Sequence, residues 1–152
     1  SLVDVGPTLL DWFDIDTPTD WPGQSLLNIA QRPDEPERVV FSEYHAAGAE
    51  TGAFMVRQGP WKLIYYVNMP CQLFNLENDP EELTDLAGTH AYMDVIAALT
   101  CELRLIVDPE MQDAQAKADQ KRLVELHGGR DAIISVGGFG ATPAPGTAPV
   151  FA

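Results

Sequence analysis

The stretch of residues 52–76 constrains the fold more than any other part of the sequence. Residues 54–57 and 61–66 alternate in character and are rich in aromatic and β-branched side chains, which is the pattern of a β-hairpin. A glycine–proline turn separates the two runs, and a third run follows at residues 72–76. The pattern predicts a small antiparallel sheet.

Alternation also assigns the faces of the second run. Trp61, Leu63 and Tyr65 share one face, and Lys62 lies on the other. We therefore expect Trp61 in the core and Lys62 paired with an acidic side chain. The two residues cannot form one anion-binding site, because they point in opposite directions.

Two further segments complete the expected fold class. Residues 38–44 form another strand candidate, and residues 90–107 show the clearest helical pattern. The apolar stripe of that helix consists of Tyr92, Val95, Ile96, Leu99, Leu103 and Ile106. The sequence predicts an α+β fold in which about four antiparallel strands pack against this long helix.

A helix is predicted at the start of the sequence. Ser1 and Asp4 have the spacing of a capping box, and Pro7 predicts a kink or a late helix start. Its apolar face is expected to contain Leu2, Gly6, Leu9, Leu10 and Phe13.

A second capping signal lies after the third strand. Asp79 suits the N-cap, Pro80 the first helical position and Glu82 the closing position of a capping box. These residues predict a short helical turn. Farther on, residues 110–127 favour a polar helix that ends at a pair of glycines.

Charge and cysteine content exclude some classes of function. The net charge of −14 over 152 residues argues against nucleic acid or an anionic membrane as a partner. Cys71 and Cys101 are too few for a disulfide framework and lack metal-ligand spacing, so we expect two buried, inert thiols. No residue of the chain is predicted to hold a metal.

Several phrases, in this order, resemble the C-terminal part of the type I sulfatases of the alkaline-phosphatase superfamily. The strongest is the pair of segments VRQGPWK and QLFNLENDPEE, at residues 56–62 and 72–82. The others are SLVD with PTLLD, WPGQSL and FSE, at residues 1–4, 7–11, 21–26 and 41–43. The resemblance covers residues 1–106, and the rest is similar to the choline-sulfatase-like and phosphonate-monoester-hydrolase-like branch.

The resemblance implies that the parent protein hydrolyses sulfate esters. Such sulfatases convert a Cys or Ser in the motif Cys/Ser-x-Pro-x-Arg to formylglycine, beside a calcium ion held by Asp and Asn. Neither Cys71 nor Cys101 stands in that motif. The nucleophile and the calcium site are therefore expected in a preceding catalytic domain. No catalytic residue is assigned to this chain, which alone is predicted to be inactive.

The resemblance also implies three parts. Residues 1–37 would belong to the end of the missing catalytic domain, residues 38–107 would form the C-terminal sulfatase subdomain, and residues 108–152 would be a polar helix and a Gly/Pro-rich tail. Leu2, Leu9 and Phe13 would pack on the missing domain. The tail is either a docking segment for a neighbouring subunit or a disordered end.

His45 is the candidate substrate-proximal residue. It follows a predicted strand in a loop that contains Gly48, and an imidazole there could donate a hydrogen bond to a sulfate oxygen. The alternative is a loop histidine whose hydrogen bonds are made by the backbone.

Other functions stay open at this point. The parent could instead hydrolyse phosphonates or phosphodiesters, or the chain could be a free-standing acidic binding or oligomerisation module. The expected partners are the missing catalytic domain, further copies of the parent and a small sulfate ester, with no nucleic acid and no membrane. The compartment is left open, with the cytoplasm favoured over the periplasm.

Overall fold

The computed structural model describes residues 1–35, 37–45 and 49–136. The chain divides into two compact units, Ser1–Pro109 and Glu110–Ala152. The assignment of residues 1–37 to a catalytic domain stays a prediction. Both alternatives for the Gly/Pro-rich tail concern residues 137–152, which lie outside the described part of the chain.

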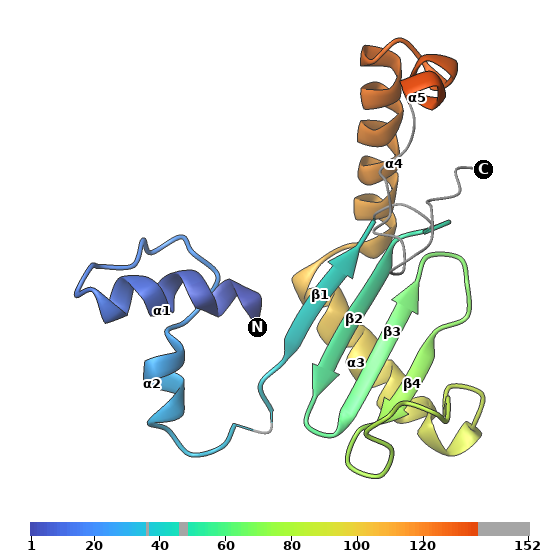
Figure 1. The fold of residues 1–152 in the computed structure, drawn as a ribbon. Helices are drawn as coiled ribbons and strands as arrows, with labels where there is room; N and C mark the ends of the chain where they lie inside the picture. The colour runs from blue at the N-terminus through green and yellow to red at the C-terminus, as the bar shows by residue number, and fades with distance from the viewer. Residues whose placement is uncertain (36, 46–48, 137–152) are drawn as a thin grey trace, which may run out of the picture. The chain divides into compact units, whose positions relative to one another are not determined.

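The first unit is built on a four-stranded antiparallel sheet. Its strands are β1 (Val40–Tyr44), β2 (Ala53–Gln58), β3 (Trp61–Tyr66) and β4 (Gln72–Asn75), and they follow one another in sequence order (Figure 1). Val56 faces Leu63 across the central pair, which is the register that alternation predicts. The α+β fold class is confirmed.

One face of this sheet carries the core. Phe54, Val56, Leu63 and Leu73 are fully buried on it, and helix α3 (Met93–Ile106) crosses the same face (Figure 1). Each such side chain contributes about 1.5–3 kcal/mol to folding when it is buried.

The predicted stripe of α3 supplies the other half of the core. Leu99 and Leu103 are buried, whereas Ile106 at the end of the helix is 48% exposed. The short 3₁₀ helix η2 (His90–Tyr92) leads into α3 and brings the Tyr92 ring to 5.3 Å from the Trp61 ring. Trp61 packs against the core as predicted, with part of its surface exposed.

The chain starts with three short helical elements, η1 (Leu2–Asp4), α1 (Val5–Trp12) and α2 (Leu26–Ala30). The Ser1–Asp4 capping box is present. Pro7 lies in the first turn of α1, after a 3₁₀ turn, so the helix starts late, as expected for a residue without an N–H group.

The helical turn predicted at Pro80 is wrong. Asp79 accepts hydrogen bonds from the N–H groups of Leu83 and Thr84, beyond the reach of an N-cap. Glu82 adopts φ +57°, which stops a right-handed helix. Its carboxylate binds Lys62 Nζ at 2.7 and 2.8 Å, so the predicted pairing of Lys62 fixes a turn in this loop.

The cysteine prediction is half wrong. Cys71 lies just before β4 and is partly buried against the core, whereas Cys101 is exposed on α3. Cys101 misses the core because the buried stripe of α3 runs through Leu99 and Leu103, and a residue two positions from each points away from it.

The second unit contains two helices in its described part. The polar helix predicted over residues 110–127 is α4 (Pro109–Leu126). Gly128 and Gly129 both have φ +88° and end it, and α5 (Arg130–Val136), which the sequence did not indicate, follows at once. None of the described helices combines the length and the apolar character needed to cross a membrane.

Candidate functional site

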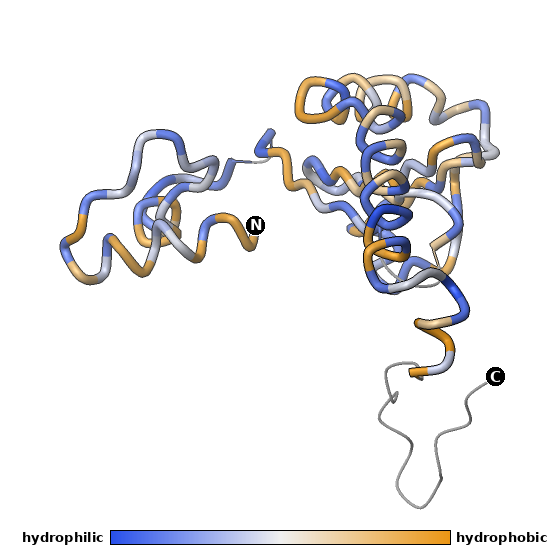
Figure 2. The backbone as a smooth tube through the Cα atoms, turned by 90° about the horizontal axis from the view of Figure 1, so that it is seen from above, coloured by the Kyte–Doolittle hydropathy of each residue, from blue (hydrophilic) through white to orange (hydrophobic). Residues whose placement is uncertain are grey.

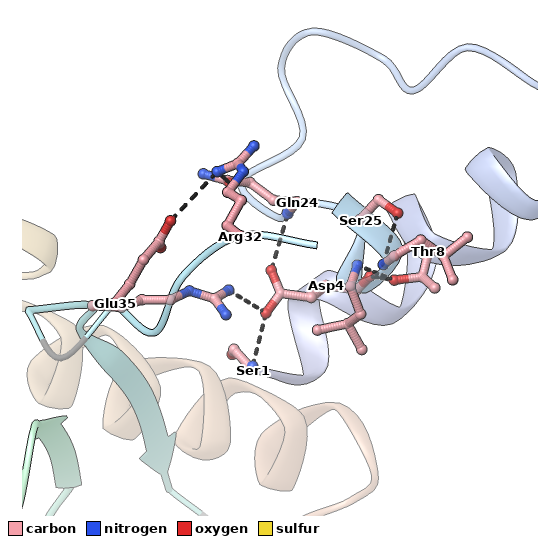
Figure 3. Close-up of polar contacts among 10 residues, drawn as sticks. Ser1, Asp4, Thr8, Gln24, Ser25, Arg32 and Glu35 are labelled. Atoms are coloured by element: carbon pink, nitrogen blue, oxygen red, sulfur yellow. Dashed lines mark hydrogen bonds and ion pairs between the residues drawn. The ribbon is translucent and has the colours of Figure 1, made fainter. Parts of the chain in front are cut away.

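The most connected polar residue of the first unit is Asp4. Its side chain is 2% exposed and accepts three hydrogen bonds (Figure 3). The Ser1 nitrogen and Arg38 Nη2 lie 2.8 and 2.6 Å from Oδ2, and the Gln24 N–H group lies 2.9 Å from Oδ1. One carboxylate thus ties η1 to the loop before α2 and to the segment before β1.

These contacts lower the pKa of Asp4. Burial raises the pKa, but the Gln24 N–H group, the Ser1 amine and the Arg38 guanidinium together outweigh burial and bring it to about 2. A carboxylate with this pKa and three donors is a poor proton acceptor at neutral pH. Asp4 therefore joins segments of the chain and is not a general base.

The polar side of α1 faces α2. Thr8 Oγ1 accepts a hydrogen bond from the Leu26 N–H group at 2.8 Å, and Ser25 Oγ donates a short hydrogen bond to Asp11 Oδ2. Ser25 also caps α2 by accepting from the Leu27 N–H group at 3.3 Å.

The same contacts explain part of the phrase WPGQSL. A Cβ atom at Gly23 would overlap the Val3 carbonyl group, so only glycine lets this loop approach η1 closely. The serine two residues later supplies the N-cap of α2. Both residue types are therefore required by packing, and neither points to catalysis.

The His45 side chain lies directly after β1 and packs inward. Its ring meets the edge of the Phe54 ring at 5.3 Å between centroids and 78° between planes. Nε2 is 3.6 Å from Glu43 Oε2, and both ring nitrogens are screened from solvent. Gly52 has no room for a Cβ atom, which would lie 2.8 Å from His45 Cε1. The residue is thus anchored on the core at the start of the loop that contains residues 46–48.

The described part of the chain offers no anion pocket near Asp4. A hollow of about 530 Å³ between α1 and α2 is lined by Asp11, Asp16 and Arg32, among other residues. Two carboxylates against one guanidinium make it unfavourable for a sulfate group.

A calcium ion also finds no donor set in this part of the chain. Within the described residues, no three His, Cys, Asp or Glu side chains gather as ligands. Calcium needs six to eight oxygen ligands, so these residues do not fit the ion that the family uses.

Sequence reasoning found part of this arrangement. The Ser1–Asp4 capping box has a local signature, whereas Arg38, which lies 34 residues from Asp4, has none. His45 was singled out for its loop, but its packing on Phe54 and Gly52 depends on strand pairing and could not be seen.

Comparison with known proteins agrees with the fold. The family model of the C-terminal domain of N-sulphoglucosamine sulphohydrolase matches residues 1–108. Arylsulfatase K of Danio rerio is 36% identical over 134 residues, which cover 82% of this chain and 25% of the relative. The chain thus spans about a quarter of the length of that relative.

Two solved structures share the architecture. A 2-O GAG sulfatase superposes with a TM-score of 0.58 and 26% identity, over 78% of this chain and 26% of the other. The phosphonate monoester hydrolase of Agrobacterium radiobacter shares the fold alone, with a TM-score of 0.51 and 20% identity, over 67% of this chain and 24% of the other. The predicted resemblance is confirmed: this chain belongs to the family of sulfatase C-terminal domains typified by N-sulphoglucosamine sulphohydrolase.

Proposed function

We propose that this chain is the C-terminal part of an enzyme that hydrolyses sulfate esters. The observation that carries the proposal is the family match over residues 1–108, together with 36% identity to an arylsulfatase. Both place the similarity in the C-terminal quarter of a longer enzyme. The reaction is assigned to the parent protein, because the chain itself supplies no nucleophile in the sulfatase motif.

The role of the chain in that enzyme is structural. Its sheet and α3 form a core of their own, and the Asp4 cluster links this core to the helices at its start. The formylglycine and the calcium ion belong to the preceding domain, where they would supply the nucleophile and the positive charge that a sulfuryl-transfer transition state needs. The chain by itself is expected to be inactive.

His45 is the residue that we assign to the border of the substrate site. Support comes from its position at the end of β1 and from the neighbouring Glu43 carboxylate. Since both ring nitrogens are buried, His45 acts as a positioning residue that fixes the start of its loop. An H45A variant of the parent should raise KM more than it lowers kcat, and H45F, which keeps the ring, should restore most of the affinity.

Three assays test the proposed reaction. The full-length parent, the 152-residue chain and a parent variant without its Cys/Ser-x-Pro-x-Arg nucleophile are compared on an aryl sulfate and on an aryl phosphonate. We expect the parent alone to act, with the sulfate preferred. A preference for the phosphonate would replace the reaction by that of the related hydrolases, whose fold is the same. Activity of the 152-residue chain alone would overturn the structural role.

Homo-oligomers of the parent remain part of the proposal. Sedimentation of the active parent measures their size, and a monomer at assay concentration would remove oligomer contacts from the role of this chain. The cytoplasm is kept as the proposed compartment, and fractionation of cells that express the parent from its own gene tests it.

A further inference from the structure

Helix α1 and the preceding η1 are amphipathic in the opposite sense to a helix of an isolated domain. Their polar side is turned inward, where Asp4, Thr8 and Asp11 bind the segment around α2. Their apolar side is turned to solvent, with Leu2 88%, Leu9 56%, Trp12 68% and Phe13 69% exposed. Figure 2 shows the same alternation of hydrophobic and hydrophilic residues along this segment.

The exposed residues form one stripe. Leu2, Val5, Leu9 and Trp12 are spaced by three or four residues, which places them on one side of a helix, and Phe13 lies beside Leu9 and Trp12. We call these five residues the α1 stripe. Single exposed apolar residues are ordinary on protein surfaces, but a contiguous stripe with two aromatic residues marks an interaction surface.

We propose that the α1 stripe is the surface on which the preceding catalytic domain of the parent packs. The inference rests on the proposed function. The chain matches about a quarter of its relatives, and the family model is that of a C-terminal domain, so about three quarters of a parent of that length precede it. The stripe lies on the first two elements of the chain, where the covalent connection holds that domain close.

Charge argues against a second copy of the chain as the occupant. Residues 1–109 contain 18 acidic and 5 basic residues. Two such units would meet with like net charge, and that repulsion opposes association at low ionic strength. A covalently attached domain binds at high effective concentration and overcomes an unfavourable charge more easily.

The decisive experiment uses the full-length parent. A photo-crosslinking amino acid, p-benzoylphenylalanine, replaces Trp12 in one variant and Leu105 in a control, because Leu105 is equally exposed, at 76%, on α3. We expect the probe at position 12 to join peptides that precede Ser1 in the same polypeptide, and the probe at position 105 to give several-fold less of that product. Crosslinks at position 12 to a second copy, or only to residues 1–152, would overturn the proposal.

A second measurement uses the 152-residue chain. The double variant L9S/W12S should bind less of an apolar fluorescent dye than the wild type, whereas the control L105S should match the wild type. Circular dichroism verifies that the variants are folded, since neither Leu9 nor Trp12 is part of the core. Equal dye binding by L9S/W12S and L105S would contradict a role of the α1 stripe as the main apolar surface.

The two proposals can fail separately. A parent that cleaves aryl sulfate but gives no crosslink from position 12 to the preceding domain retains its function and loses the interface. A parent that crosslinks as expected but cleaves neither ester retains the interface and loses the function.

Discussion

Arg38 and Asp4 lie 34 residues apart and meet at 2.6 Å between Nη2 and Oδ2. Arg38 precedes β1, and Asp4 ends η1, so this ion pair is a direct link between the helical start of the chain and the sheet. The Asp4 side chain is buried, and its partner is 28% exposed. Buried carboxylates are expensive to leave without a partner, which makes this contact a test of how the first unit is held together.

Replacing Arg38 by alanine should lower the free energy of unfolding by about 2–3 kcal/mol. Breaking a buried ion pair costs about 3–5 kcal/mol, and the remaining donors of Asp4 and the partial exposure of Arg38 reduce that value. Urea unfolding of the 152-residue chain measures the change. The control is R32A, because Arg32 and Glu35 form an exposed pair at 3.6 Å, worth about 0–1 kcal/mol. Equal losses in R38A and R32A would show that the Asp4 contact contributes nothing special.

The pH dependence of stability should contain the contribution of Asp4. Its pKa is lowered from 3.8 to about 2 in the folded chain, so folding favours the ionised form. This contribution is complete above about pH 4 and is lost as the pH falls through about 2, and it amounts to about 2 kcal/mol.

The D4N variant isolates this contribution. D4N cannot titrate at position 4, so the difference in unfolding free energy between wild type and D4N should shrink as the pH falls from 4 to about 2. Acetylation of the Ser1 amine provides a second comparison, because it removes one of the cations that lower the pKa of Asp4. A difference that stays constant over this range would mean that Asp4 keeps an ordinary pKa.

Gly52 should tolerate no side chain. An alanine Cβ atom would lie 2.8 Å from His45 Cε1 and 2.9 Å from Phe54 Cε2, and both atoms belong to rigid rings. We expect G52A to destabilise the chain by about 1–3 kcal/mol, the usual cost of overpacking. The matched control is G88A, since nothing lies within 4 Å of a Cβ atom at Gly88. Thermal unfolding compares the two variants, and a G52A protein as stable as G88A would contradict the observed packing of His45.

Two leucines of α3 should differ sharply. Leu103 is fully buried, and Leu105 is 76% exposed, on the same helix. L103A should lose about 2–5 kcal/mol through the transfer and cavity terms, and L105A less than about 0.5 kcal/mol. Guanidinium unfolding followed by circular dichroism measures both. Similar losses would mean that α3 does not pack on the sheet through the predicted stripe.

The contact of Lys62 with Glu82 should be worth about 1 kcal/mol. Both oxygens of Glu82 bind Lys62 Nζ, and both side chains are about a quarter exposed, so solvent weakens the attraction. A double-mutant cycle with K62M and E82Q gives the coupling energy, which should fall in 1 M salt. A coupling energy near zero at low salt would show that Glu82 adopts its positive φ for another reason.

Local patterns were sufficient for much of the fold. Alternation placed Trp61 and Leu63 on the core face and Lys62 on the other, because a strand repeats every two residues whatever it packs against. Helical spacing identified the stripe of α3 for a similar reason. The capping box at Ser1 and Asp4 also formed as predicted, since it needs contacts only within one turn.

The failures occurred where distant contacts outweighed local preference. Asp79, Pro80 and Glu82 have the chemistry of a helix start, but Lys62, 20 residues away in sequence, holds Glu82 in a turn instead. Cys101 fits the apolar composition of α3 but lies off its buried stripe, which only the position of the sheet fixes.

The sequence by itself determined the strands, the helices and which of their faces are apolar, because these follow from side-chain periodicity and backbone chemistry within a few residues. Only the tertiary structure decided which faces are covered. It buried Asp4 beside Arg38 and left Leu9 and Trp12 exposed, because burial depends on which segments meet in space and not on the preference of any one segment.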